Sequence, residues 1–178
     1  MVPALHGWNQ QHYVPEKGYV PHAHKILRTP MGTGYLGKGM YFSVLDPSGV
    51  AAQLECYNYR SGRALANLHI CKPVVVHDVD RQGQNATWMM RQFHEAVSTK
   101  PFGGETGWGS TEYRQWLFKA ARRKGYDAFV YLTNNNSAGC EHGSQIAVLN
   151  MGIIEVLDWN YNVQPELERL RADWRGWE

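Results

Sequence analysis

Short hydrophobic runs near the two ends of the chain predict β-strands. Each run concentrates apolar, aromatic or β-branched residues between Gly, Pro, Asn or Asp, a pattern typical of strands. The runs are VPALHG (2–7), GMYFSVL (39–45), KPVVVHDV (72–79), DAFVYLT (127–133), QIAVLN (145–150) and IIEVLDW (153–159).

Residues 110–125, STEYRQWLFKAARRKG, show the clearest helical pattern. Ser110 is positioned to cap the first turn, and Gly125 follows the last turn, where cations suit the helix dipole. The apolar residues that recur with helical spacing are Tyr113, Trp116, Leu117, Ala120 and Ala121.

Three further segments predict helices. The first begins at Pro47 with Asp46 as its N-cap, the second covers 87–97 with Thr87 as its cap, and a charged helix covers 165–174. The proline-rich stretch 15–34 predicts a long loop. Together these elements predict one α+β domain over residues 1–178, with a mostly antiparallel or mixed sheet.

Composition narrows the functional classes only slightly. Seven Trp and ten Tyr offer large surfaces for a core or for stacking on a planar ligand. A net charge of +2 is far from that of a dedicated nucleic-acid binder. Three cysteines without a CxxC pair support neither a disulfide framework nor a zinc site, and His22 and His24 form an HxH pair without further marked ligands. This spacing of Cys and His leads us to expect no metal. No signal peptide or membrane span is encoded, so we expect a soluble chain with no membrane partner.

Two segments near the N-terminus carry candidate chemistry. In LHG (5–7), an imidazole lies beside a residue without a Cβ, where a ligand can approach the backbone. In LGKGMYFS (36–43), the glycines lack the rest of a dinucleotide-binding fingerprint or a P-loop. Taken singly, each segment also fits an ordinary structural strand.

In their order along the chain, three motifs resemble the ADP-ribosyltransferase family of the His-Tyr-Glu type, which includes diphtheria toxin and the poly(ADP-ribose) polymerases. The motifs are LHG, LGKGMYFS and KGYDAFVYLTNNNSAGCEHGSQIAVLN (124–150), and the resemblance spans residues 4 to 158. It implies an ADP-ribosyltransferase-like fold, in which two packed, mostly antiparallel sheets with flanking helices surround a cleft for NAD, the substrate.

The resemblance also implies roles for individual residues. His6 would bond the adenosine-side ribose of NAD, and the backbone of Gly7 would hold the nicotinamide amide. Tyr41 would pack beneath the nicotinamide ring, with Ser43 as a further cofactor-binding residue. His6, Tyr41 and Gln145 would form the catalytic set.

A second aromatic face for the ring is expected from Tyr57 or Tyr59. Stacking on a cationic heterocycle is favourable, which supports this assignment. Packing in the core is the alternative for both tyrosines.

The chain departs from the family at Gln145, where the motif has Glu. A glutamine keeps a hydrogen bond to the nicotinamide ribose but lacks the charge, which is worth about 3–4 kcal/mol in a site of this kind. Three explanations remain open: a native glutamine, an engineered isosteric inactivation, or a catalytic acid at Glu141 instead.

The acceptor is not identified by the sequence. Position 143 carries an acid in arginine-modifying members and Gln in guanine-modifying members, and Gly143 supports neither class. A solvated helix face and a surface for nucleic acid or diphosphate are the alternatives for the cations of the long helix, which are Arg114, Arg122, Arg123 and Lys124.

We therefore expect an NAD-dependent mono-ADP-ribosyltransferase acting on a macromolecular acceptor, either protein or nucleic acid. An NAD- or ADP-ribose-binding pseudoenzyme and an NAD glycohydrolase are the alternatives. The resemblance further implies a toxin or effector domain of bacterial or phage origin, cut from a larger protein and paired with an immunity protein. Such a toxin would be secreted and would act in the cytoplasm of the target cell; otherwise the location is open.

Overall fold

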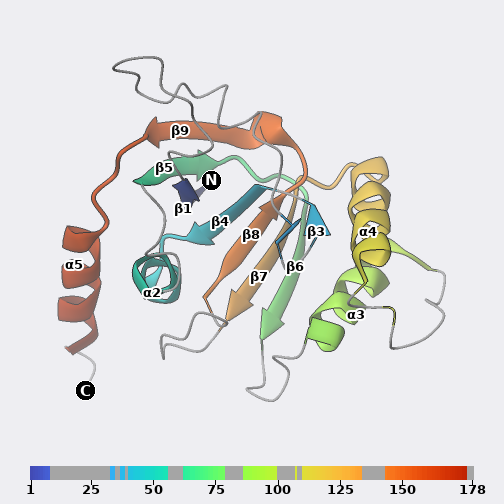
Figure 1. The fold of residues 1–178 in the computed structure, drawn as a ribbon, viewed down its shortest axis with the longest axis horizontal. Helices are drawn as coiled ribbons and strands as arrows, with labels where there is room; N and C mark the ends of the chain where they lie inside the picture. The colour runs from blue at the N-terminus through green and yellow to red at the C-terminus, as the bar shows by residue number, and fades with distance from the viewer. Residues whose placement is uncertain are drawn as a thin grey trace.

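The structure is a computed structural model, which describes residues 1–8, 33–34, 37–38, 40–55, 62–78, 86–99, 107, 110–133 and 143–175 (Figure 1). The strands are β1 (Val2–Trp8), β2 (Thr33–Gly34), β3 (Gly37–Lys38), β4 (Met40–Val44), β5 (Gly62–Leu68), β6 (Pro73–Asp78), β7 (Ala128–Thr133), β8 (Gln145–Val148) and β9 (Ile154–Asp158). The helices are α2 (Pro47–Glu55), α3 (Ala86–Val97), α4 (Thr111–Arg123) and α5 (Gln164–Arg175), with a 3₁₀ turn, η4 (Met151–Ile153). This content confirms the α+β class.

Seven of these strands form a single mixed sheet in the order β6-β7-β8-β4-β1-β5-β9. All neighbours are antiparallel except β6 and β7, which are parallel. The described strands therefore do not show two packed sheets, because pairing of β1 with β4 joins all seven into one. The short strands β2 and β3 form a separate ladder.

The ladder between β1 and β4 is the shortest in the seven-stranded sheet. The β1–β4 ladder consists of two residue pairs, Ala4 with Val44 and Leu5 with Ser43. By contrast, β1 pairs with β5 along its whole length, from Val2 to Trp8. We call this short connection the seam; on one side of it lie β1, β5 and β9, and on the other β4, β8, β7 and β6 (Figure 1).

Two pairs of helices cover one face of the sheet on the two sides of the seam. The α3/α4 layer packs on β6, β7 and β8 through a cluster that includes Phe93, Leu117 and Phe129. The α2/α5 layer packs on β1 and β5 through a cluster that includes Leu5 and Val50. Figure 1 shows the two layers at opposite sides of the view.

The opposite face of the sheet carries a third apolar cluster. It draws on strands from both sides of the seam and includes Ala4, Phe42, Ala66 and Ile146. The two halves of the sheet therefore share one core despite the short seam between them.

Several helix ends lie where the sequence predicts them. Asp46 caps α2, since its Oδ1 accepts the Gly49 N–H at 2.7 Å. Ser110 caps α4 by accepting the Tyr113 N–H at 3.1 Å. Gly125 adopts a φ of 74° after α4, a left-handed conformation that favours glycine.

Other sequence expectations are wrong. Helix α3 begins at Ala86, one residue before Thr87, the expected cap. Trp116 is 41% exposed and stacks on His94 at 5.3 Å between ring centroids, so it lies at the edge of the buried stripe. Strand β5 was not expected at all. Of the predicted loop 15–34, only Thr33 and Gly34 are described. Among the described residues, no helix is long and apolar enough to cross a membrane.

Candidate functional site

The peptide group of Gly7 points into the seam beyond its last residue pair. In an antiparallel ladder, the N–H and C=O of one residue point to the same neighbouring strand and alternate along the chain. The Pro3 carbonyl accepts the Leu45 N–H at 3.0 Å, so the odd-numbered residues of β1 point toward β4. The β1–β4 ladder does not extend to Gly7. Its N–H and C=O therefore face the open end of the seam.

The imidazole of His6 crosses the same gap. Its Nδ1 lies 2.7 Å from the backbone carbonyl oxygen of Tyr41 on β4. Because a carbonyl only accepts, Nδ1 carries the proton, and Nε2 carries the lone pair in the neutral ring. The ring also lies 5.3 Å from that of Phe42. His6 thus replaces a backbone pair where the ladder stops, and its tautomer is fixed.

Gln145 occupies a row of side chains that crosses four strands. Register pairs Leu5 with Ser43, Ser43 with Gln145, and Gln145 with Tyr131, so all four lie on the same face of the sheet. Gln145 is half-buried, whereas Ser43 and Tyr131 on its two sides are buried. The row holds no carboxylate, and it places Gln145 between the α2/α5 and α3/α4 layers.

Tyr41 lies one row further along the same face. It pairs with Ala147, which makes it a diagonal neighbour of Gln145 at about 7–8 Å. Its side chain is half-buried and packs against the cluster of the α3/α4 layer. The structure therefore places Gly7, Tyr41 and Gln145 on three neighbouring strands, with the Tyr41 and Gln145 side chains on one face of the sheet. The His6 side chain lies on the opposite face, against Phe42.

Tyr57 and Tyr59 lie outside the described residues, so the expected second face of the ring stays a prediction. Glu141, the alternative acid, also lies outside them. Of the three tyrosines expected from the sequence at the candidate site, the described part of the chain thus includes Tyr41 alone.

Ser43 is buried beneath α2. It is 2% exposed, and its Oγ accepts a hydrogen bond from Gln53 Nε2 at 2.8 Å. Gln53 is 4% exposed, and its Oε1 has no hydrogen-bond partner in the described part of the chain. An unsatisfied buried acceptor costs about 1–3 kcal/mol. Ser43 is thus too buried to contact a ligand directly and could act only through neighbouring side chains. The stability of the fold does not explain why a glutamine with an unsatisfied oxygen occupies position 53.

The first turn of α2 fixes the start of β8, just before Gln145. Ser48 Oγ accepts the Ser144 N–H at 3.1 Å, and the Ser144 carbonyl accepts the Val44 N–H at 3.0 Å. A Cβ on Gly143 would lie 2.9 Å from Ala52 Cβ and 3.1 Å from the Ser48 carbonyl oxygen. Position 143 therefore has no room for a side chain without a shift of the backbone.

Asp127, in the KGYDAFVYLT segment, has a structural role far from Gln145. Its Oδ2 accepts the N–H groups of Cys71 and Lys72 at 3.0 and 2.9 Å, and its backbone carbonyl accepts the Leu149 N–H at 2.8 Å. Burial opposes ionisation, but these N–H groups, Asn150 and the charge of Lys72 outweigh it and lower the pKa of Asp127. The carboxylate thereby ties together the ends of β6, β7 and β8.

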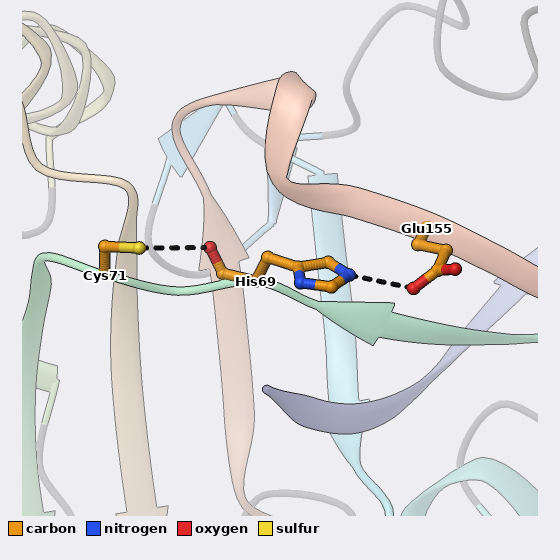
Figure 2. A network of polar contacts seen from close by, with 3 residues as sticks. All are labelled: His69, Cys71 and Glu155. Carbon is orange, nitrogen blue, oxygen red and sulfur yellow. Dashed lines mark hydrogen bonds and ion pairs between the residues drawn. The ribbon is translucent and has the colours of Figure 1, made fainter.

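A second group of polar side chains, His69, Cys71 and Glu155, lies at the surface (Figure 2). His69 Nε2 is 2.8 Å from Glu155 Oε2, and this hydrogen bond lowers the pKa of Glu155. Figure 2 shows that the imidazole points to Glu155, while the Cys71 thiol, an exposed free cysteine, points to the His69 carbonyl instead. The three side chains do not converge, and no cluster that could hold a metal occurs among the described residues.

Comparison of the chain with protein-family models, curated proteins and solved structures gives no match. The resemblance to ADP-ribosyltransferases therefore depends on the residues of this chain and their arrangement.

Two residues near the candidate site were missed by sequence reasoning: Tyr131, which pairs with Gln145, and Gln53, which bonds Ser43. Gln53 follows Val50 by three positions, so it is a polar residue within the apolar stripe of α2, and that contrast was a usable signal. Tyr131 is recognisable only from the register that pairs it with Gln145.

Proposed function

We propose that this chain transfers ADP-ribose from NAD to a macromolecular acceptor and has an ADP-ribosyltransferase-like fold. The observation that carries the proposal is the convergence at the seam: the peptide group of Gly7 faces the gap, with Tyr41 on the next strand and Gln145 on the one after it. The seven strands form one sheet, and its shortest ladder, the seam, is where the two sheets of that fold would have to part.

Each group at the seam suits one part of NAD. A primary carboxamide has both a donor and an acceptor, which complement the C=O and N–H of Gly7. The half-buried ring of Tyr41 offers a stacking surface for nicotinamide. The resemblance assigns the adenosine-side ribose to His6, whose Nδ1 lies 2.7 Å from the Tyr41 carbonyl oxygen, so a ribose hydroxyl would have to bond the other ring nitrogen.

The reaction breaks the bond between the nicotinamide nitrogen and ribose C1′. The electron pair leaves with nicotinamide, and the positive charge develops on the ribose. A nucleophile of the acceptor then forms a bond to C1′ and loses its proton to solvent. Gln145 would hydrogen-bond the nicotinamide ribose but supplies no charge, so we expect slow turnover.

The acceptor must be oriented by groups other than residue 143. In members of that family, the side chain at this position orients arginine or guanine. In this chain Gly143 has no side chain, and its neighbours leave no room for one without a shift of the backbone. Protein and nucleic-acid acceptors therefore both remain within the proposal.

Incubation of the protein with cell lysate and NAD labelled in its ADP-ribose part tests the proposal. Label on protein or nucleic acid supports transfer. Free labelled ADP-ribose without labelled macromolecule identifies a glycohydrolase, and binding of NAD without cleavage identifies a binding module; either result overturns the transferase. The absence of a carboxylate from the row of Gln145 favours the binding module as the second candidate.

Gln145→Glu provides a gain-of-function arm. Restoring the charge should raise the rate of nicotinamide release by about 10²–10³-fold, the usual scale of one such electrostatic contribution. Gln115→Glu makes the same change at an exposed position of α4 and should leave the rate unchanged. If the Gln145 variant binds NAD but releases nicotinamide at an unchanged rate, residue 145 does not lie close to ribose C1′.

A further inference from the structure

Four of the five buried polar side chains in the described part of the chain lie where α2 meets β4 and β8. These are Ser43, Ser48, Gln53 and Ser144. Ser48 and Ser144 bond to each other, and Ser48 also bonds to Asp46, the capping residue of α2, which gives this pair a structural role. Ser43 and Gln53 form a separate pair, with a buried acceptor, Gln53 Oε1, left over. This second pair needs another explanation.

The pair adjoins Gln145 directly. Ser43 and Gln145 are opposite each other on β4 and β8, so their Cβ atoms are about 4.5–5.5 Å apart. No hydrogen bond joins the two side chains in the structure, so a bond between them requires the Gln145 side chain to rotate toward Ser43. Ser43 Oγ already accepts from Gln53, which leaves its single proton to donate to another acceptor.

We propose that Gln53 and Ser43 are positioning residues that determine which end of the Gln145 carboxamide faces NAD. Gln53 holds the Ser43 hydroxyl, the hydroxyl donates to Gln145 Oε1, and the Gln145 amide group is thereby turned toward the substrate. The group presented to NAD is then a donor, matched to a sugar oxygen that accepts. This inference rests on the proposed function and specifies the polarity of that site.

The arrangement distinguishes a positioning role from a structural one. If Gln53 only stabilised the fold, replacing it with a residue of similar length and no amide would destabilise the protein. Because its Oε1 is buried without a partner in the described residues, Gln53→Met should instead leave the melting temperature unchanged or raise it. The same variant should weaken NAD binding.

Calorimetric titration with NAD is the binding measurement. Gln53→Met and Ser43→Cys, which keeps the volume but has only a weak donor, should each raise the Kd about five- to tenfold, as expected for one hydrogen bond. The double variant should be no weaker than either single variant, since both interrupt one chain of contacts. Gln115→Met on the exposed face of α4 is the matched control and should leave the Kd unchanged.

A spectroscopic readout follows the carboxamide itself. In a ¹H–¹⁵N spectrum with NAD bound, the side-chain amide signals of Gln145, assigned by their loss in Gln145→Ala, should shift in Ser43→Cys and in Gln53→Met. Unshifted signals, multiplicative losses of affinity, or a destabilised Gln53→Met with normal NAD binding would each overturn the positioning role alone. Failure of the unmodified protein to bind NAD would instead overturn the proposed function, and this inference with it.

Discussion

The two helix layers cover the same face of one sheet with different chemistry. The α3/α4 layer is built on large apolar groups, with the Phe93 and Phe129 rings 4.7 Å apart. Burial there also raises the pKa of Tyr113, whose hydroxyl donates to the Met90 carbonyl. The α2/α5 layer instead contains four buried polar side chains at the contact of α2 with the sheet.

This difference indicates a division of roles. Apolar packing in the α3/α4 layer stabilises the fold, whereas the polar contacts of α2 fix the strands that carry Ser43 and Gln145 at a cost in stability. Changes in the first layer should therefore alter stability more than ligand binding. Changes under α2 should alter ligand binding more than stability.

The largest expected effect tests the apolar layer. Phe93 is fully buried, and Phe93→Ala should lower the free energy of unfolding by about 3–5 kcal/mol through lost contacts and a cavity. Urea denaturation measures the loss. The NAD affinity of the folded fraction should stay within twofold of the original, and a large loss of affinity would contradict the division of roles.

An intermediate effect is expected at the contact of α2 with β8. Gly143→Ala places a methyl group 2.9 Å from Ala52 Cβ, and such overpacking should cost about 1–3 kcal/mol on denaturation. The shift of β8 should also weaken NAD binding. Combining it with Ala52→Gly removes the closest clashing atom and should restore much of the affinity. If Gly143→Ala leaves NAD binding intact, β8 is not fixed by this contact.

The smallest effect is expected far from the seam, at Asp127. Its lowered pKa in the folded chain means that its stabilisation is complete above the unfolded pKa, about 4, and is lost as the pH falls through the folded value. Asp127→Ala should cost about 1–2 kcal/mol at pH 7 and progressively less as the pH falls below about 4. Denaturation at pH 7 and at a series of acid pH values measures this. Glu95→Ala, exposed on α3, is the control; an equal loss at every pH for Asp127→Ala would contradict the ionic contribution.

The sequence predicted the elements whose local signals are strong. Asp46 and Ser110 lie at helix starts because their side-chain oxygens satisfy unpaired N–H groups, a local interaction. Strand β5, GRALANL, was missed because it lacks β-branched and aromatic residues. It forms a strand through its long-range pairing with β1 and β9, which no local pattern encodes.

The candidate site divides in the same way. The sequence singles out His6, Gly7, Tyr41 and Gln145 because their motifs are local, and the structure places them on neighbouring strands. The contact of Gln53 with Ser43 depends on how α2 packs on β4, which a sequence pattern does not specify. The same limit applies to the lack of space at Gly143.

The short seam has a consequence for how binding could be lost or retained. The β1–β4 ladder ends before Gly7 although β4 continues to Met40, and a small aromatic carboxamide could bond the Gly7 main chain as a peptide segment bonds an exposed sheet edge. Recognition of that kind depends on the main chain. Most side-chain substitutions around the seam would leave the Gly7 main chain in place. Binding of the carboxamide should therefore be more resistant to mutation than any other contact at the candidate site.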